Sequence, residues 1–214
     1  MRKLLIAAVL ATTLPSAGSA QLASRPTGDW IKMMEAPDRV ASLKIDAMIA
    51  SLGLHAGDTV ADIGAGPGVI SLPLAKAVGE KGKVYAVEID RPFLDRIHER
   101  AAEEHLPNVV PVLGEFTDPK LPARDVDVAF FHDVLHHIED RAGYVKAMAR
   151  YMKPTSRMAV IEYLPTGPHR SDPSLILTPE QVGKWMADAG FAPAGKYDDL
   201  PGKWYVIYER KPGV

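Results

Sequence analysis

Residues 60–68 read VADIGAGPG, a short apolar strand pattern that runs directly into three glycines. Residues 59–63 are expected to form a buried strand, and residues 69–78 (VISLPLAKAV) a helix that tolerates Pro73 only in its first turns. The glycines let the backbone turn sharply and let a ligand approach it closely. The start of the helix adds unpaired backbone N–H groups. The stretch therefore predicts a ligand site at the beginning of an α/β unit.

Strands and helices alternate on both sides of this loop. Further strands are expected at residues 84–89, 108–113, 126–131, 157–163 and 204–209, and helices at 37–54, 92–104, 141–151 and 179–189. Pro111 indicates an edge position or a bulge, and Thr178 is a plausible N-cap. The last strand should pair within residues 192–198. This alternation predicts a doubly wound, mainly parallel α/β sheet in one domain spanning residues 37–214.

The composition is that of an ordinary globular domain. The chain has 214 residues, 47% hydrophobic and 24% charged, with a formal net charge of −2. Without a basic excess, neither nucleic acid nor an anionic membrane is favoured as a partner. The chain has no cysteine, which excludes thiolate catalysis and cysteine-ligated zinc or iron–sulfur sites.

The first twenty residues have the pattern of a secretory signal. Arg2 and Lys3 precede an uncharged apolar run at residues 4–14, and small residues fill positions 16–20. The run is short for a spanning helix, which needs about 20 apolar residues. We expect cleavage after Ala20 and export to the periplasm or out of the cell. An uncleaved anchor and an ordinary buried helix are the alternatives.

Residues 21–36 are polar and contain the breakers Pro26 and Gly28, so we expect an irregular N-terminal segment or lid there. Trp30, Met33 and Met34 interrupt its polarity. We expect them to pack on the domain rather than to close over a pocket.

An acidic residue at the end of the second strand provides a partner for a nucleoside. Glu88 lies 20 residues after Gly68, where a carboxylate can accept both ribose hydroxyls of an adenosine-type cofactor. Asp90 is the weaker candidate and is expected to be solvated. Val69 stands where the dinucleotide fingerprint has its third glycine, which disfavours nicotinamide and flavin dinucleotides. No lysine–serine or lysine–threonine pair follows, so the loop is not a P-loop. A tight turn that only packs helix on sheet is the structural alternative.

With these features the sequence resembles class I S-adenosylmethionine (SAM)-dependent methyltransferases, and most closely the ubiquinone/menaquinone-biosynthesis and type 11 branch. The motif D-x-G-x-G-x-G begins at Asp62, Glu88 ends the second strand, and Gly114 and Glu115 follow the third. The resemblance spans residues 37–210. It implies a Rossmann-like, three-layer α/β/α fold whose seven-stranded sheet has an antiparallel last strand. It also implies that SAM is the cofactor and that its methyl group passes by in-line displacement to a small-molecule acceptor, by default a hydrophobic or phenolic one.

The resemblance further implies where the cofactor lies. The glycine loop would hold the methionine end, Glu88 the ribose, and Ile89 with the 114–116 segment the adenine. Glu115 stands where the family more often has aspartate. The expected cofactor-binding residues are Asp62, Gly64, Ala65, Gly66, Gly68, Glu88, Ile89, Glu115, Phe116 and His132.

A histidine-rich segment, HDVLHH at residues 132–137, follows the fourth strand at the sheet edge where such folds bind ligands. The histidines could line the pocket, act as a general base or hold a metal. We favour pocket lining and assign no metal. If one is the base, His132 and His136 are the candidates. Glu162, at the end of the fifth strand, is a candidate polar wall or an ion-pair partner, and His169 is expected to lie in an inert loop.

Two rival functions stay open at this stage. An exported, non-catalytic module that binds SAM or its demethylated product would have the same loop. An NAD-dependent oxidoreductase is disfavoured by Val69. No membrane contact is expected beyond the signal, and nothing in the sequence indicates the oligomeric state.

Overall fold

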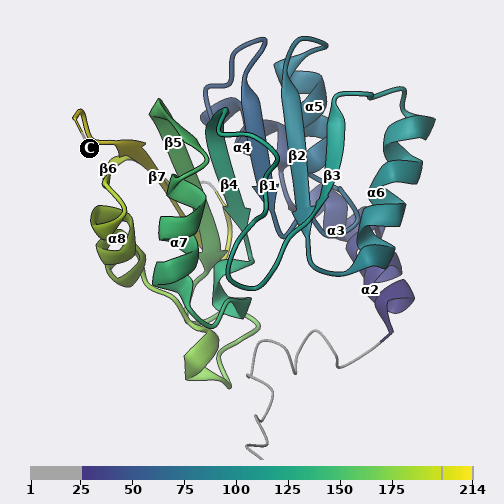
Figure 1. The fold of residues 1–214 in the computed structure, drawn as a ribbon. Coiled ribbons are helices and arrows are strands. Elements are labelled where there is room, and N and C mark those ends of the chain that lie inside the picture. Colours follow the sequence, from purple (N-terminus) through teal and green to yellow (C-terminus); the bar gives the residue numbers. More distant parts are fainter. Residues whose placement is uncertain (1–25, 199, 214) are drawn as a thin grey trace, which may run out of the picture.

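The computed structural model describes residues 26–198 and 200–213, which form a seven-stranded sheet between two layers of helices (Figure 1). The expected signal at residues 1–20 lies outside the described residues. The sheet order is β3-β2-β1-β4-β5-β7-β6, and β7 runs antiparallel to both of its neighbours while the other pairs are parallel. This confirms the predicted doubly wound sheet with an antiparallel last strand. The strands are β1 (Thr59–Ile63), β2 (Lys83–Glu88), β3 (Val109–Leu113), β4 (Val126–His132), β5 (Met152–Tyr163), β6 (Phe191–Tyr197) and β7 (Lys203–Arg210).

Each face of the sheet has its own apolar core. Helices α7 (Arg141–Ala149) and α8 (Pro179–Asp188) pack on one face, and α4 (Ile45–Ser51), α5 (Ser71–Val78) and α6 (Arg91–Glu103) on the other. Strand β1 lies between β2 and β4 and is buried along its whole length, as its apolar sequence predicts. The remaining elements are α2 (Thr27–Met34), α3 (Pro37–Ser42) and the short 3₁₀ turns η1 (Leu135–His137) and η2 (Pro173–Leu175).

The helix expected over residues 37–54 is two helices. Lys44 has a left-handed backbone (φ 49°), which ends α3 and lets α4 begin in a new direction. The break separates two environments, because Leu43 lines a cavity whereas Met48 and Leu52 belong to the core on the sheet. The periodicity was shared by both helices, so it did not reveal the break.

The N-terminal segment is also more regular than expected. Residues 27–34 form α2, because Pro26 precedes the first helical residue and therefore does not interrupt the helix. Two contacts tie the ends of α2 to the α6 region: Thr27 donates a 2.7 Å hydrogen bond to Asp90, and Arg96 holds Glu35 at 2.8 and 3.0 Å. Asp90 is thus bonded rather than solvated.

Two local predictions are confirmed. Strand β3 is an edge strand, so the missing N–H of Pro111 breaks no central ladder. Thr178 caps α8 in a reciprocal capping box with Gln181. Within the part of the chain that the structure describes, none of the helices has both the length and the apolarity needed to cross a membrane.

Candidate functional site

A cavity of about 810 Å³ opens where β1, β2 and β4 end. Its walls include helices α2 and α3, the glycine loop after β1, the end of β2, the segments after β3 and β4, and the chain that follows β5. In Figure 1, α2, the turn after β4 and the chain between β5 and α8 lie toward the same end of the sheet. This is the edge at which doubly wound folds bind their ligands.

Two of the three loop glycines line the cavity. Gly64 and Gly66 both have positive φ, at 69° and 54°. A Cβ on Gly64 would lie 2.3 Å from a methyl of Val134, so this glycine permits close packing against the segment after β4. A Cβ on Gly66 would meet only the sulfur of Met34, at 3.1 Å. Gly66 therefore leaves open a part of the cavity into which any side chain would project.

Gly68, which we expected to bind the cofactor, does not line the cavity. A Cβ there would come within 3.0 Å of Leu72 in α5 and 3.1 Å of Ile97 in α6. Its role in this structure is to let the start of α5 pack closely. The three glycines look alike in the sequence, and only the positions of neighbouring side chains distinguish them.

Glu88 is held rigidly by the backbone around it. One carboxylate oxygen accepts a 2.9 Å hydrogen bond from the N–H of Gly66, and the other accepts one of 2.9 Å from the N–H of Ile89. Burial raises the pKa of this carboxyl above its usual range, and the two backbone bonds oppose the rise. Because each carboxylate oxygen has a further lone pair, Glu88 can still accept hydroxyl donors from the cavity.

Asp62 lies at the end of β1 and is 2% exposed. The hydroxyl of Ser71 donates to it at 2.5 Å. Burial raises the pKa of Asp62 to about 7; the Ser71 bond lowers it, and the charge of Glu88 raises it. A cationic group placed beside Asp62 would favour its ionised form.

Four further residues that were expected to bind the cofactor also line the cavity. Ala65 and Ile89 line it, as do Glu115 and Phe116 after β3. Glu115 is largely exposed and pairs with Lys120 at 3.3 Å, and Phe116 is 47% exposed. These two side chains can adjust to a ligand, whereas Glu88 cannot.

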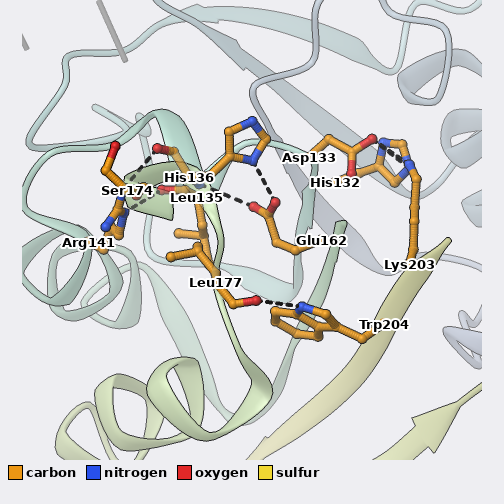
Figure 2. A network of polar contacts seen from close by, with 10 residues as sticks. All are labelled: His132, Asp133, Leu135, His136, Arg141, Glu162, Ser174, Leu177, Lys203 and Trp204. Carbon is orange, nitrogen blue, oxygen red and sulfur yellow. Dashed lines mark hydrogen bonds and ion pairs between the residues drawn. The ribbon is translucent and has the colours of Figure 1, made fainter. Parts of the chain in front are cut away.

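His132 is one of the two expected base candidates. Its ring contacts a charged partner (Figure 2), and its buried environment disfavours the protonated form. Its Nε2 lies 2.8 Å from Nζ of Lys203, which also donates to Asp133. Burial lowers the pKa of His132 to about 4, with Asp133 raising it and Lys203 lowering it further. The neutral imidazole thus accepts a bond from the ammonium, and its lone pair is already in use.

His136, the other candidate, is paired with Glu162 (Figure 2). Nδ1 of His136 lies 2.6 Å from one carboxylate oxygen, and the backbone N–H of His136 donates to the other at 3.3 Å. Both side chains are buried. His136 lines the cavity, and its Nε2 has no hydrogen-bond partner among the described residues.

Three residues of the site carried no signal in the sequence, or a misleading one. Lys203 follows a Pro–Gly turn and reaches His132 only because β7 pairs with β5. Trp30 and Met34 line the cavity, although we expected them to pack on the domain surface.

His169 also lines the cavity, although we expected an inert loop, and its ring centroid lies 4.5 Å from that of His136. Within residues 26–198 and 200–213, no group of three or more His, Asp or Glu side chains is arranged to hold a metal ion.

Residues 60–155 match the family model described as "Methyltransferase domain". This segment is a methyltransferase domain. A SAM-dependent methyltransferase from Aquifex aeolicus superposes with a TM-score of 0.77 and 26% identity, covering 87% of this chain and all of its own.

Curated relatives are also methyltransferases. The 2-phytyl-1,4-naphtoquinone methyltransferase of Trichormus variabilis is 26% identical over 66% of this chain and 58% of its own. The ubiquinone/menaquinone biosynthesis C-methyltransferase of Chromobacterium violaceum is 32% identical over 54% of this chain and 47% of its own. The chain spans about half the length of the curated relatives it matches.

The residues of the cavity fit SAM, which the Aquifex aeolicus neighbour is described as using. Gly66 leaves space where any Cβ would intrude, and the rigid carboxylate of Glu88 lines the same cavity. The matched segment contains the glycine loop, Glu88 and the histidines after β4. Helix α2, Glu162 and Lys203 lie outside it. The family match therefore covers the cofactor end of the cavity more fully than the other end.

Proposed function

We propose that the protein transfers the methyl group of SAM to a small-molecule acceptor bound in the same cavity. The observation that carries this proposal is one continuous cavity. Its walls include the glycine loop and Glu88, which would hold the cofactor, and also α2, His136 and His169, which leave room for an acceptor. When bound, SAM supplies a methyl group already activated on a sulfonium sulfur. The protein therefore has to align the acceptor in line with that methyl group and exclude water.

The cofactor end is assigned to residues that line the cavity. Glu88 accepts the ribose hydroxyls, Ile89 lies along the adenine, and Gly64, Ala65 and Gly66 lie along the methionine end. Asp62 faces the cationic part of that end. Glu115 and Phe116 close the adenine side, with His132 beside the methionine end. Gly68 supports the loop through packing instead of contact.

The acceptor end has apolar and aromatic walls, supplied by Trp30, Met34, Tyr163 and other residues. This favours a hydrophobic or phenolic small molecule. The curated relatives include a 2-phytyl-1,4-naphtoquinone methyltransferase and a ubiquinone/menaquinone biosynthesis C-methyltransferase, whose names refer to small organic molecules.

We further propose that the chain is exported, with residues 1–20 as a cleaved signal, because the basic start, the apolar run and the small residues before Gln21 have that pattern. N-terminal sequencing of the protein recovered from outside the cytoplasm should begin at Gln21. Recovery from the cytoplasm with an intact Met1 would reject export.

Calorimetric titration of the purified protein with S-adenosylhomocysteine (SAH) tests the cofactor site. We expect binding that is lost in Gly66→Arg and weakened in Glu88→Ala. In Gly66→Arg the new side chain would project into the cavity, and only Met34 lies near its Cβ. Gly183→Arg on α8 is the matched control, because nothing lies within 4 Å of a Cβ there. A folded wild-type protein that binds no SAH would refute the proposal. Binding without transfer to any of a broad set of acceptors would favour a non-catalytic module.

A further inference from the structure

We infer that His136 is the general base of the reaction, that Glu162 positions it, and that the acceptor carries an acidic hydroxyl, phenolic or enolic, which is methylated on oxygen. This inference rests on the proposed function and specifies its acceptor. It begins from the pair of side chains that join the end of β5 to the turn after β4 (Figure 2).

Glu162 determines which nitrogen of His136 carries the proton. Its two oxygens accept from the ring Nδ1, at 2.6 Å, and from the backbone N–H of the same residue, at 3.3 Å. A carboxylate acceptor places the imidazole proton on Nδ1 and leaves the lone pair on Nε2. Figure 2 shows the second ring nitrogen on the side away from Glu162. The His136–Glu162 pair thus has the arrangement of a general base whose ring is held in position by a carboxyl group.

The lone pair on Nε2 has no partner among the described residues, although the side chain is only 2% exposed. A buried acceptor without a donor is destabilising. A hydroxyl on the acceptor would supply the missing donor, because His136 lines the cavity. The ring of His169, on the chain that follows β5, packs beside it with the ring centroids 4.5 Å apart, and we expect the acceptor to displace that ring.

The neighbouring histidines are worse bases. The Nε2 of His132 already accepts from Lys203, and its pKa is lowered to about 4. His137 has an unpartnered Nδ1 but no carboxylate bond, and burial with its histidine neighbours lowers its pKa to about 3. Of these three histidines, His136 is the one whose ring is hydrogen-bonded to a carboxyl side chain.

Charged and titratable groups face His136 from four places. Glu162 comes from β5 and His169 from the chain after it, Asp133 and His137 come from the segment after β4, and Arg141 begins α7. Arg141 donates to the carbonyl of His136, so its charge lies on the backbone side of the residue. Glu162 and Asp133 are the acidic side chains in this set.

The step balances without any further reagent. The acceptor hydroxyl gives its proton to Nε2 of His136, and an oxygen electron pair forms the new bond to the methyl carbon. The carbon–sulfur bond breaks with its electron pair left on sulfur, so the products are a methyl ether and SAH. The imidazolium then releases its proton to water after the product leaves. General-base catalysis of this kind contributes about 10²- to 10⁴-fold.

The test compares the wild type with His136→Asn, Glu162→Gln and the surface control His98→Asn, using phenols and anilines that share one ring skeleton. All four proteins should bind SAH with similar affinity. Phenols should be methylated on oxygen, and His136→Asn should lower that rate by about 10²- to 10⁴-fold. Glu162→Gln should lower it less and move the acid limb of the pH–rate profile to lower pH, because the imidazolium loses its carboxylate. A merely structural Glu162 would leave that limb in place.

A second measurement needs no acceptor. In ¹⁵N-histidine NMR of the SAH complex, the neutral ring of His136 should carry its proton on Nδ1. A proton on Nε2 would overturn the inference. So would anilines as the only substrates, methylation on carbon, or His136→Asn transferring to phenols at the wild-type rate. If the wild type binds no SAH, the proposed function fails, which is a different outcome from SAH binding with an indifferent His136.

Discussion

The packing of Gly64 against Val134 predicts a measurable coupling between the glycine loop and the segment after β4. In Gly64→Ala the new methyl would lie 2.3 Å from Cγ2 and 2.9 Å from Cβ of Val134. Overpacking of this kind costs about 1–3 kcal/mol, and alanine at a left-handed φ of 69° adds about 1–2 kcal/mol. The variant should therefore lose about 2–5 kcal/mol of unfolding free energy. Gly66→Ala has a similar φ but only a flexible neighbour in Met34, so it should lose about 1–2 kcal/mol.

Urea unfolding of Gly64→Ala, Val134→Ala and the double variant measures this coupling. Removing the Val134 methyl groups relieves the 2.3 Å contact, so the double variant should be about 1–2 kcal/mol more stable than the sum of the two single losses predicts. Equal losses in Gly64→Ala and Gly66→Ala, or strict additivity with Val134→Ala, would refute the packing argument.

Three further predictions concern buried charges and a helix cap. The pKa of Asp62 is about 7 in the folded protein against 3.8 for an unperturbed aspartate, so the folded state loses stability as the pH rises from about 4 to 7. Asp62→Asn cannot ionise, so its unfolding free energy relative to that of the wild type should rise by about 4 kcal/mol over that range, measured by urea unfolding at several pH values. Lys203→Met should raise the pKa of His132 in an NMR titration, because it removes a nearby positive charge. It should also cost about 3–5 kcal/mol of stability, because buried Asp133 loses its ammonium partner; an unchanged titration would contradict the pairing. Thr178→Ala should cost about 1 kcal/mol with SAH affinity unchanged, and a loss of affinity would mean that α8 affects the site.

The fold was predictable because its signals are local. The apolar run before Gly64 and the strands of similar character after it specify a parallel sheet through their own periodicity. Pro111 and Thr178 each act within a few residues, and both predictions are confirmed. The errors arise where one pattern fits two structures. The apolar spacing around Lys44 suits one helix or two, and the polarity of residues 27–34 suits a loop or an exposed helix.

The site was predictable only as far as the sheet edge. Parallel strands β4 and β5 end together, so histidines after β4 were expected near Glu162, and they are. The sequence left His132 and His136 equivalent, because the difference between them depends on Lys203, a residue about 70 positions away that β7 brings alongside. The packing partners of Gly68 in α5 and α6 are likewise visible only in three dimensions.

The position of Glu162 has a consequence for how the two ends of the cavity behave. Its carboxylate bonds both the ring and the backbone of His136, so the base is fixed to strand β5 at the edge of the rigid sheet. The walls that an acceptor would contact are attached differently: His169 lies on the chain after β5, and α2 is held at its ends by the Thr27–Asp90 and Glu35–Arg96 contacts. Transfer requires precise placement of the base, whereas entry of the acceptor requires a wall that can move. The same cavity satisfies both requirements because they fall on different elements.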